Sequence, residues 1–297
     1  MGATLITSDL HPDDHDFTRV AKNGCTGLQL FREVAMPFML SLSDQCDVTF
    51  INNGDGINAV AYLAEAMVKR SDIYADLAAF RRYNRHTRRV RFNPGNHDRR
   101  LQGCKHLWYE DEQHHLVHDC WYEHGHRLDL VWRNPGPVKS WVGEHIIKTG
   151  AQFESKVHWI DEAVCGAAGL AAKVLLPKGH KVGDEEYIRA AIALAKWDAN
   201  IRRVVFGHTH RALYEVCPYT HVDADGNLVT RQVTVVNTNA WVPSPSACKY
   251  GWYGKGDVAP FMYWVERDWL LQVRPEGMAL KGDCGIRHKI GRLVWTP

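Results

Sequence analysis

Short runs with apolar residues, each followed by polar residues, recur along the first two thirds of the chain. Four of them are predicted to be strands: residues 4–7, 47–51, 89–92 and 203–206. Apolar residues at helical spacing predict three helices between them, over residues 27–42, 57–68 and 71–80. A kink or a break is expected at Pro37, because proline lacks a backbone donor. Strands that alternate with helices are typical of an α/β fold.

The middle of the chain has a more helical character. Residues 99–115 are expected to be helical and 116–122 to form a strand. An alanine-rich apolar helix is predicted over 157–176, and an amphipathic helix over 184–199. We interpret residues 133–200 as a helical cap inserted into the fold.

Beyond the cap, alternating apolar and polar residues predict two hairpins. Their strands are 212–217 with 232–236, and 261–265 with 269–273. The expected organisation is therefore a single domain, 1–297, with a β-rich C-terminal part at 211–297.

Five of the strand-like runs end in short loops that contain Asp, Asn or His. The loops are Asp9-Leu10-His11, Gly54-Asp55, Gly95-Asn96-His97-Asp98, His124-Gly125 and Gly207-His208-Thr209-His210. Loops at the carboxyl ends of strands in an open α/β sheet converge on one crevice, so these side chains can meet in space. The alternative is that these polar residues only cap turns. Because the same pattern occurs after five strands, turn capping explains it poorly.

These loops offer two Asp, one Asn and four His side chains as metal ligands, and no Cys. The candidates are Asp9, His11, Asp55, Asn96, His124, His208 and His210. Mixed oxygen and imidazole ligands suit Mn²⁺, Fe, Co²⁺ or Zn²⁺, and the set is too large for one tetrahedral ion. Two ions that share one carboxylate fit better.

Composition limits the remaining classes of function. A net charge of +2 over 297 residues gives no electrostatic argument for nucleic acid. Eight cysteines without a CxxC pair, and an N-terminus without a signal-peptide pattern, predict a reducing cytoplasmic location. No stretch reaches the ~20 apolar residues of a membrane helix, which leaves peripheral contact with a membrane open.

The order of the five loops resembles the calcineurin-like metallophosphoesterase family, whose pattern DxH, GD, GNHD, HG and GHxH is complete in this chain. The motifs span residues 9–210, and the resemblance fades through the C-terminal 87 residues. It implies a four-layer α/β/β/α sandwich. It also implies two ions, held by Asp9, His11 and His210, by Asn96, His124 and His208, and by Asp55 between them.

The resemblance assigns roles to two further residues. His97 would lie beside the leaving group, oriented by Asp98. Arg99 and Arg100 follow this motif directly and are expected to contact the substrate. Mn²⁺ is the favoured ion, with Fe, Zn²⁺, Co²⁺ and Ni²⁺ as alternatives.

The implied reaction is hydrolysis of a phosphodiester or pyrophosphate by a hydroxide that bridges two metal ions. The order SDLH, PGNHD, HGH, helical insertion and GHTH resembles the bacterial UDP-2,3-diacylglucosamine hydrolase branch, whose members cleave a pyrophosphate and hold an acyl chain with a helical insertion. The expected substrate is a phosphorylated small molecule, nucleotide-linked or lipid-linked. Phosphoprotein phosphatases carry GDxVDRG and GNHE, which Ile57, Asn58 and Asp98 do not match.

Three alternatives use the same fold. A phosphomonoesterase shares the ligand set. A recombination-repair-type nuclease shares the motifs, but the small net charge and the lack of a coiled-coil arm disfavour it. A metal-free scaffold would keep the fold and lose ligands, whereas this chain retains all of them. Residues 236–241 resemble the NTGSW segment of related phosphoesterases, with Asn239 and Ala240 in place of Gly and Ser.

Overall fold

The fold is seen in a computed structural model. It describes residues 2–12, 15–57, 71–82, 86–98, 101–112, 114–128, 184–223, 225–243 and 257–282. The predicted helices at 57–68 and 157–176 lie almost entirely outside these ranges, as do Arg99 and Arg100.

One sheet, which we call sheet A, has six strands in the order β11-β10-β9-β1-β2-β3. Its parallel part consists of β1 (Gly2–Thr7), β2 (Asp47–Asn53) and β3 (Arg88–Asn93). Its antiparallel part consists of β9 (Phe261–Trp264), β10 (Trp269–Arg274) and β11 (Gly277–Gly282). The predicted strands 261–265 and 269–273 are therefore confirmed as a pair, and β11 adds a strand that the pattern did not reveal.

The second sheet, sheet B, has five strands in the order β4-β5-β6-β8-β7. They are β4 (His114–Val117), β5 (Cys120–Glu123), β6 (Arg203–Phe206), β7 (Ala212–Val222) and β8 (Leu228–Thr238). β5, β6 and β8 are parallel, while β7 and β8 form the predicted hairpin with longer strands than expected. The β-rich C-terminal part thus completes both sheets.

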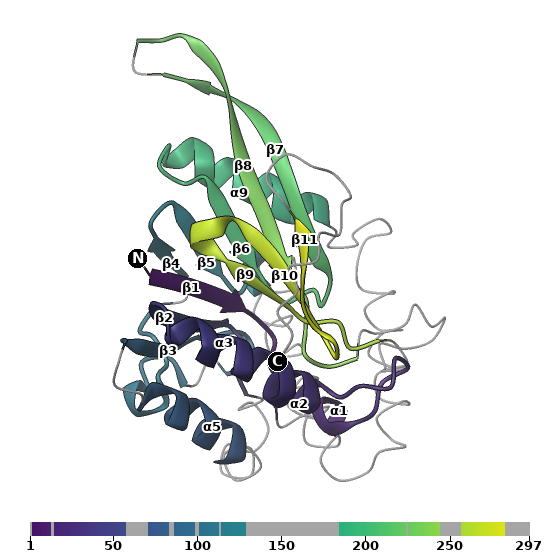
Figure 1. Ribbon diagram of the computed structural model, residues 1–297. Helices are drawn as coiled ribbons and strands as arrows, with labels where there is room; N and C mark the ends of the chain where they lie inside the picture. Colours follow the sequence, from purple (N-terminus) through teal and green to yellow (C-terminus); the bar gives the residue numbers. More distant parts are fainter. Residues whose placement is uncertain are drawn as a thin grey trace, which may run out of the picture.

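The two sheets pack face to face, with helices on both outer sides (Figure 1). Between the sheets lies a core that includes Ile6, Ile51 and Tyr263 of sheet A and Val205 and Val236 of sheet B. Sheet A is covered by α2 (Gly27–Gln29), a π-helix (Leu30–Ala35), α3 (Met36–Ser43) and α5 (Ser71–Arg81). Sheet B is covered by α9 (Asp184–Trp197), whose Ala191 and Ala195 pack on Val204 and Val235. These layers confirm the α/β/β/α sandwich.

The segment expected to be a cap contributes to one of these layers. Residues 184–197 of the predicted cap form α9, which contacts β6, β7 and β8. This part is the outer layer on sheet B, because its apolar face has the sheet to cover. The rest of the expected cap, 133–183, lies outside the described residues.

The irregularity expected at Pro37 is a change of helix type and not a break. The backbone stays helical from α2 through the π-helix into α3, and Pro37 lies in the first turn of α3, directly after the π-helix. Proline lacks the N–H of a regular α-helical turn, and a π-helical stretch is one way in which a helix accommodates such an interruption.

Two expectations between residues 99 and 122 are wrong. The described residues of 99–115 form no α-helix: Lys105–Leu107 is a 3₁₀ turn, and Gly103 (φ 76°) and Trp108 (φ 66°) take left-handed conformations that interrupt a helix. The predicted strand 116–122 is the hairpin β4–β5, with a turn at His118 (φ 56°). The remaining short elements are α1 (His15–Thr18) and the 3₁₀ turns His126–Leu128 and Val265–Arg267. None of the helices in the described ranges is long and apolar enough to span a membrane.

Gly27 gives a test of how tightly α2 packs on the C-terminal part of the chain. A Cβ at this position would lie 1.9 Å from the carbonyl oxygen of Trp241 and 2.7 Å from Cδ2 of Phe17. We expect Gly27→Ala to destabilise the protein by about 1–3 kcal/mol in urea unfolding, although Ala is normally the better helix former. Gly2→Ala is the control, since its nearest neighbour is at 3.5 Å. Equal stabilities of the two variants would contradict the packing.

Candidate metal centre

The five polar loops lie together at the carboxyl ends of the parallel strands of both sheets. The loops after β1 and β2 are joined by two backbone hydrogen bonds, from Asp9 N to Gly54 O (3.1 Å) and from His11 N to Asp55 O (3.2 Å). The loops after β5 and β6 are joined in the same way, from Gly207 N to His124 O (3.0 Å). The convergence of loops expected from the strand order therefore involves both sheets.

Backbone strain is concentrated in these loops. Nine non-glycine residues of the described chain have positive φ, and five of them are candidate ligands. The five are Asp9, His11, Asp55, His208 and His210. Left-handed backbone is costly for residues other than glycine and gathers at functional sites, where the surrounding structure holds it in place.

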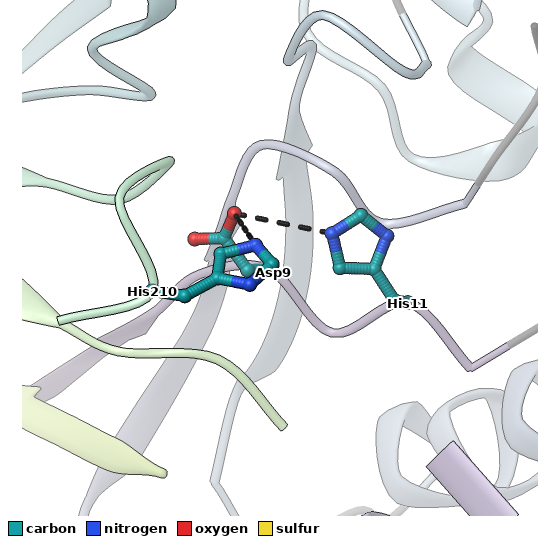
Figure 2. A group of neighbouring side chains, drawn as sticks. All are labelled: Asp9, His11 and His210. Carbon is teal, nitrogen blue, oxygen red and sulfur yellow. Dashed lines mark ion pairs between the residues drawn. The ribbon is translucent and has the colours of Figure 1, made fainter. Parts of the chain in front are cut away.

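One group of ligand atoms comes from Asp9, His11 and His210, whose side chains point toward one another (Figure 2). Asp9 Oδ1 lies 3.3 Å from His210 Nε2 and 4.0 Å from His11 Nε2. The other oxygen, Oδ2, accepts a hydrogen bond from His208 N (2.9 Å), which fixes the direction of the carboxylate. Asp9 Oδ1 is buried and accepts no well-aligned hydrogen bond from the described residues, so the group fits a cation.

A second group comes from Asp55, His124 and His208. Asp55 Oδ2 lies 3.0 Å from His124 Nε2, and Asp55 Oδ1 accepts a hydrogen bond from His97 N (3.0 Å). Asn96 adds an oxygen to this group, since its Oδ1 lies 3.1 Å from His124 Nε2. Within each group the ligand atoms of the Asp and His residues lie within 4.8 Å of one another, a spacing that one metal ion can span.

The two groups adjoin each other at Asp55. Its Oδ2 lies 3.8 Å from His11 Nε2 of the first group, while His124 Nε2 lies 3.9 Å from Asp9 Oδ1. All seven ligand candidates are therefore brought together around two carboxylates. Asp9 and Asp55 are 0% and 2% exposed, so water does not hydrate their charge.

The pKa values of the carboxyl and imidazole groups show that this site attracts positive charge. The Asp55 and Asp9 carboxylates outweigh desolvation and raise the pKa of His124 to about 10. In turn, His124 outweighs desolvation and lowers the pKa of both carboxyl groups. Desolvation lowers the pKa of His11 to about 3, so this imidazole keeps a free lone pair at neutral pH. Two buried carboxylates that attract positive charge, with the neutral imidazole of His11 beside them, form a donor set suited to divalent cations.

His97 lies at the rim of the site. Its side chain is 30% exposed, its Nε2 is 3.9 Å from Asp55 Oδ2, and its ring centroid is 5.2 Å from that of His11. Desolvation outweighs the Asp55 carboxylate and lowers the pKa of His97. This neutral imidazole can still donate an N–H hydrogen bond to a group bound in the crevice.

Asp98 is buried and contacts the loops that follow β2 and β3. Its Oδ2 accepts hydrogen bonds from Gly56 N (2.6 Å) and Tyr109 Oη (2.8 Å), and its Oδ1 accepts one from Gly95 N (2.5 Å). Burial, and then the Asp55 charge, raise the pKa of Asp98 to about 7. The expected role of orienting His97 stays a prediction. These contacts connect Asp98 to the loops that carry Asp55 and Asn96.

The segment that resembles NTGSW supports the first loop from below. Trp241 N donates to Asp9 O (3.1 Å), Trp241 Nε1 donates to Thr7 Oγ1 (2.8 Å), and Ser8 Oγ donates to Asn239 O (3.2 Å). Asn239 has φ 61°, a left-handed conformation that glycine, the residue at this place in NTGSW, adopts readily. Asparagine is among the residues that tolerate it, so the departure keeps the backbone path.

Sequence reasoning missed several polar residues around the site. Asn53, Asn93 and Asn237 are buried at strand ends, and Tyr109 is buried on Asp98. The ring of His126 lies 5.6 Å from that of His124, which agrees with a supporting role. The available signal was an asparagine just after each of three predicted strands, at residues 53, 93 and 237.

Comparisons with known proteins add little to this geometry. No protein family model matches the chain, and no curated protein matches it. Among solved structures, Vps29 from Chaetomium thermophilum has a TM-score of 0.37 at 11% identity, covering 94% of this chain and 89% of that one. A double mutant of Vps29 from Entamoeba histolytica has a TM-score of 0.36 at 13% identity, with the same coverage of 94% and 89%. A predicted phosphoesterase from Streptococcus pneumoniae has a TM-score of 0.31 at 10% identity, with coverage of 94% and 96%. Likeness at this level does not assign a function.

Gly95 tests whether Asp55 must hold its present position. A Cβ at residue 95 would lie 2.1 Å from Asp55 Oδ1, so Gly95→Ala must displace that carboxylate. We expect Mn²⁺ binding, measured by the EPR signal of free Mn²⁺, to weaken by about 10–100-fold.

Gly226→Ala is the control for general loss of stability. Gly226 has φ 83° at the tip of the β7–β8 hairpin, and a Cβ added there would have no neighbour within 4 Å, so only backbone strain is added. This variant should lose stability and keep its Mn²⁺ affinity. Unchanged Mn²⁺ binding in Gly95→Ala would separate Asp55 from the metal site.

Proposed function

We propose that this protein is a dinuclear metal-dependent phosphoesterase that hydrolyses a phosphodiester or pyrophosphate bond. The observation that carries the proposal is the place of Asp55 Oδ2, 3.0 Å from His124 Nε2 and 3.8 Å from His11 Nε2. One carboxylate oxygen thus faces both ligand groups, as a bridge between two ions requires. The complete order of the five motifs supports the same interpretation.

The ligands we propose follow the two groups. One ion is held by Asp9, His11 and His210, the other by Asn96, His124 and His208, and Asp55 is shared. Oxygen and imidazole donors without thiolate favour Mn²⁺, with Fe, Zn²⁺, Co²⁺ and Ni²⁺ as alternatives. When bound, such a pair of ions supplies Lewis-acid polarisation of the phosphoryl group and a nucleophile at neutral pH.

The chain's own residues supply orientation and proton transfer. Asp9 and Asp55 are each fixed by a backbone N–H, from His208 and His97, so their free oxygens stay directed at the site. His97 is the exposed imidazole at the rim, and we assign it the hydrogen bond to the departing oxygen. Asp98 and Tyr109 keep the Asp55 loop in place through Gly56 N.

The substrate class rests on the motifs. Their order favours a diester or pyrophosphate in a nucleotide-linked or lipid-linked small molecule, and Asn58 and Asp98 depart from the protein phosphatase pattern. Arg99 and Arg100 remain proposed substrate contacts. Peripheral contact with a membrane would accompany a lipid-linked substrate.

The first test is hydrolysis of bis-p-nitrophenyl phosphate and p-nitrophenyl phosphate with Mn²⁺. We expect diester cleavage that falls by more than about a hundredfold in Asp55→Ala, because losing a ligand costs more than losing a residue that supports one. Asp225→Ala, an exposed carboxylate at the hairpin tip, is the matched control and should remain active.

The other outcomes separate the alternatives. Turnover of the monoester alone would indicate a phosphomonoesterase. Failure to cleave either compound, with two ions bound, would favour a scaffold of the same fold. Cleavage of DNA in preference to the small diester would favour the nuclease.

His97 can be tested through its dependence on the leaving group. Protonation matters most when the departing oxygen is basic, so His97→Ala should lower kcat by about 10²–10⁴-fold for an alkyl leaving group. The loss should be much smaller for p-nitrophenolate, which leaves readily without a proton. Metal content of the variant should match that of the wild type, and equal losses for both leaving groups would exclude the role.

A further inference from the structure

The candidate metal centre depends on how the ends of the two sheets meet. Its carboxylates, Asp9 and Asp55, follow strands of sheet A, whereas His124 and His208 follow strands of sheet B. The apolar core between the sheets does not fix a polar edge to within the few tenths of an ångström that metal ligands need. Directional hydrogen bonds between the sheets at this edge are therefore required.

Asn53, the last residue of β2, supplies such hydrogen bonds. Its side-chain Nδ2 donates to Glu123 O (2.8 Å) and to Val205 O (3.2 Å). Glu123 directly precedes His124, and Val205 lies three residues before His208. One amide of sheet A thus holds both strands of sheet B at the points where their histidine loops begin.

The backbone of Asn53 also fixes the ring of His124. His124 Nδ1 donates to Asn53 O (2.9 Å), because a carbonyl oxygen can only accept. This leaves Nε2 as the nitrogen that faces Asp55 Oδ2 at 3.0 Å. A hydrogen bond to the other ring nitrogen is the usual device that orients a metal-binding histidine.

Asn93 fixes the amide of Asn53 from the other side. The two residues are paired in register on β2 and β3, and Asn93 Nδ2 donates to Asn53 Oδ1 (3.0 Å). This contact turns the NH₂ group of Asn53 toward sheet B. Both side chains are 0% exposed.

Asn93 is an unfavourable residue for stability alone. Asparagine is depleted in strands, and Asn93 Oδ1 is buried without a hydrogen-bond partner among the described residues. Such a group costs about 1–3 kcal/mol, so an apolar residue of similar size would suit the strand better. What Asn93 provides, and an apolar residue would not, is the hydrogen bond to Asn53 Oδ1.

We infer that Asn53 and Asn93 are positioning residues for the second ligand group, holding the His124 and His208 loops of sheet B against Asp55 of sheet A. This inference rests on the proposed metal centre. It adds two residues that touch neither ion nor substrate and that act on the affinity of one of the two ions.

The experiment compares Asn53→Ala and Asn93→Val with wild type by Mn²⁺ titration, followed by the EPR signal of free Mn²⁺. His11→Ala and His208→Ala assign the two binding steps, because each removes a ligand of only one group. We expect both asparagine variants to weaken the step assigned to His208 by about 10–100-fold and to leave the other step nearly unchanged. Diesterase activity of Asn53→Ala should recover as Mn²⁺ is raised.

Two controls separate positioning from loss of stability. Leu270→Ala truncates a side chain that is 0% exposed in the core between the sheets, and should lower stability without selective loss of one ion. Asn93→Val removes the unpaired Asn93 Oδ1 but leaves Asn53 Oδ1 without its donor, so stability in urea unfolding should stay close to that of wild type while the second ion binds more weakly.

The outcomes distinguish this inference from the proposed function. Suppose that wild type binds two ions, and that the asparagine variants have the same two Mn²⁺ affinities as Leu270→Ala. The inference is then overturned, whereas the proposed metal centre stands. If wild type binds no Mn²⁺, the metal centre fails and the inference fails with it. Selective loss of the second ion in a fully stable Asn93→Val would support it.

Discussion

Two buried carboxylates at the edge where the sheets meet are the constraint on which this structure depends. Asp9 and Asp55 each use one oxygen to accept a backbone N–H and direct the other at imidazole nitrogens. Buried charges are costly unless they are paired, so the surrounding chain must supply positive charge or bind it. Without an ion, a protonated His124 meets part of this demand, as the raised pKa of its imidazole shows.

The same constraint accounts for the strained backbone of the loops. Side chains that follow different strands reach one point only if the chain turns sharply after each strand, and the left-handed conformations of Asp9, Asp55 and His208 make these turns. Close approach is equally necessary. Gly54 has φ 90°, and a Cβ there would lie 2.2 Å from His124 Nδ1, so a side chain would force the two loops apart. Strain and close packing are tolerated here because hydrogen bonds from neighbouring residues hold the loops in place. Trp241 N donates to Asp9 O, and Asp98 Oδ2 accepts from Gly56 N.

How much of this could be predicted from the sequence depends on the range of each interaction. The alternation of strands and helices and the five loops were predictable, because strands, turns and motif residues are encoded within a few neighbouring positions. The four-layer sandwich was implied by the family that these motifs resemble. The supporting residues were not, since Asn53 acts on residues 70 and 152 positions away. The helix expected at 99–115 failed for a local reason, because left-handed turns at Gly103 and Trp108 override a polar and aromatic pattern that periodicity alone leaves ambiguous. The contacts of Asp98 could not be predicted either, because its position in the motif does not reveal that Gly95 N and Tyr109 Oη donate to it.

The arrangement also bears on whether the fold serves chemistry or only architecture. A scaffold has no reason to keep left-handed aspartate and histidine where glycine would relieve the strain, or two carboxylates at 0% and 2% exposure where apolar residues would pack without desolvation cost. It would also have no need of the buried pair Asn53 and Asn93, in which the amide oxygen of Asn93 has no hydrogen-bond partner in the described part of the chain. Proteins retain such locally unfavourable residues where function requires them. In this chain they coincide at one edge of the sandwich, around one pair of carboxylates, and this coincidence is the physical argument for an active metal centre.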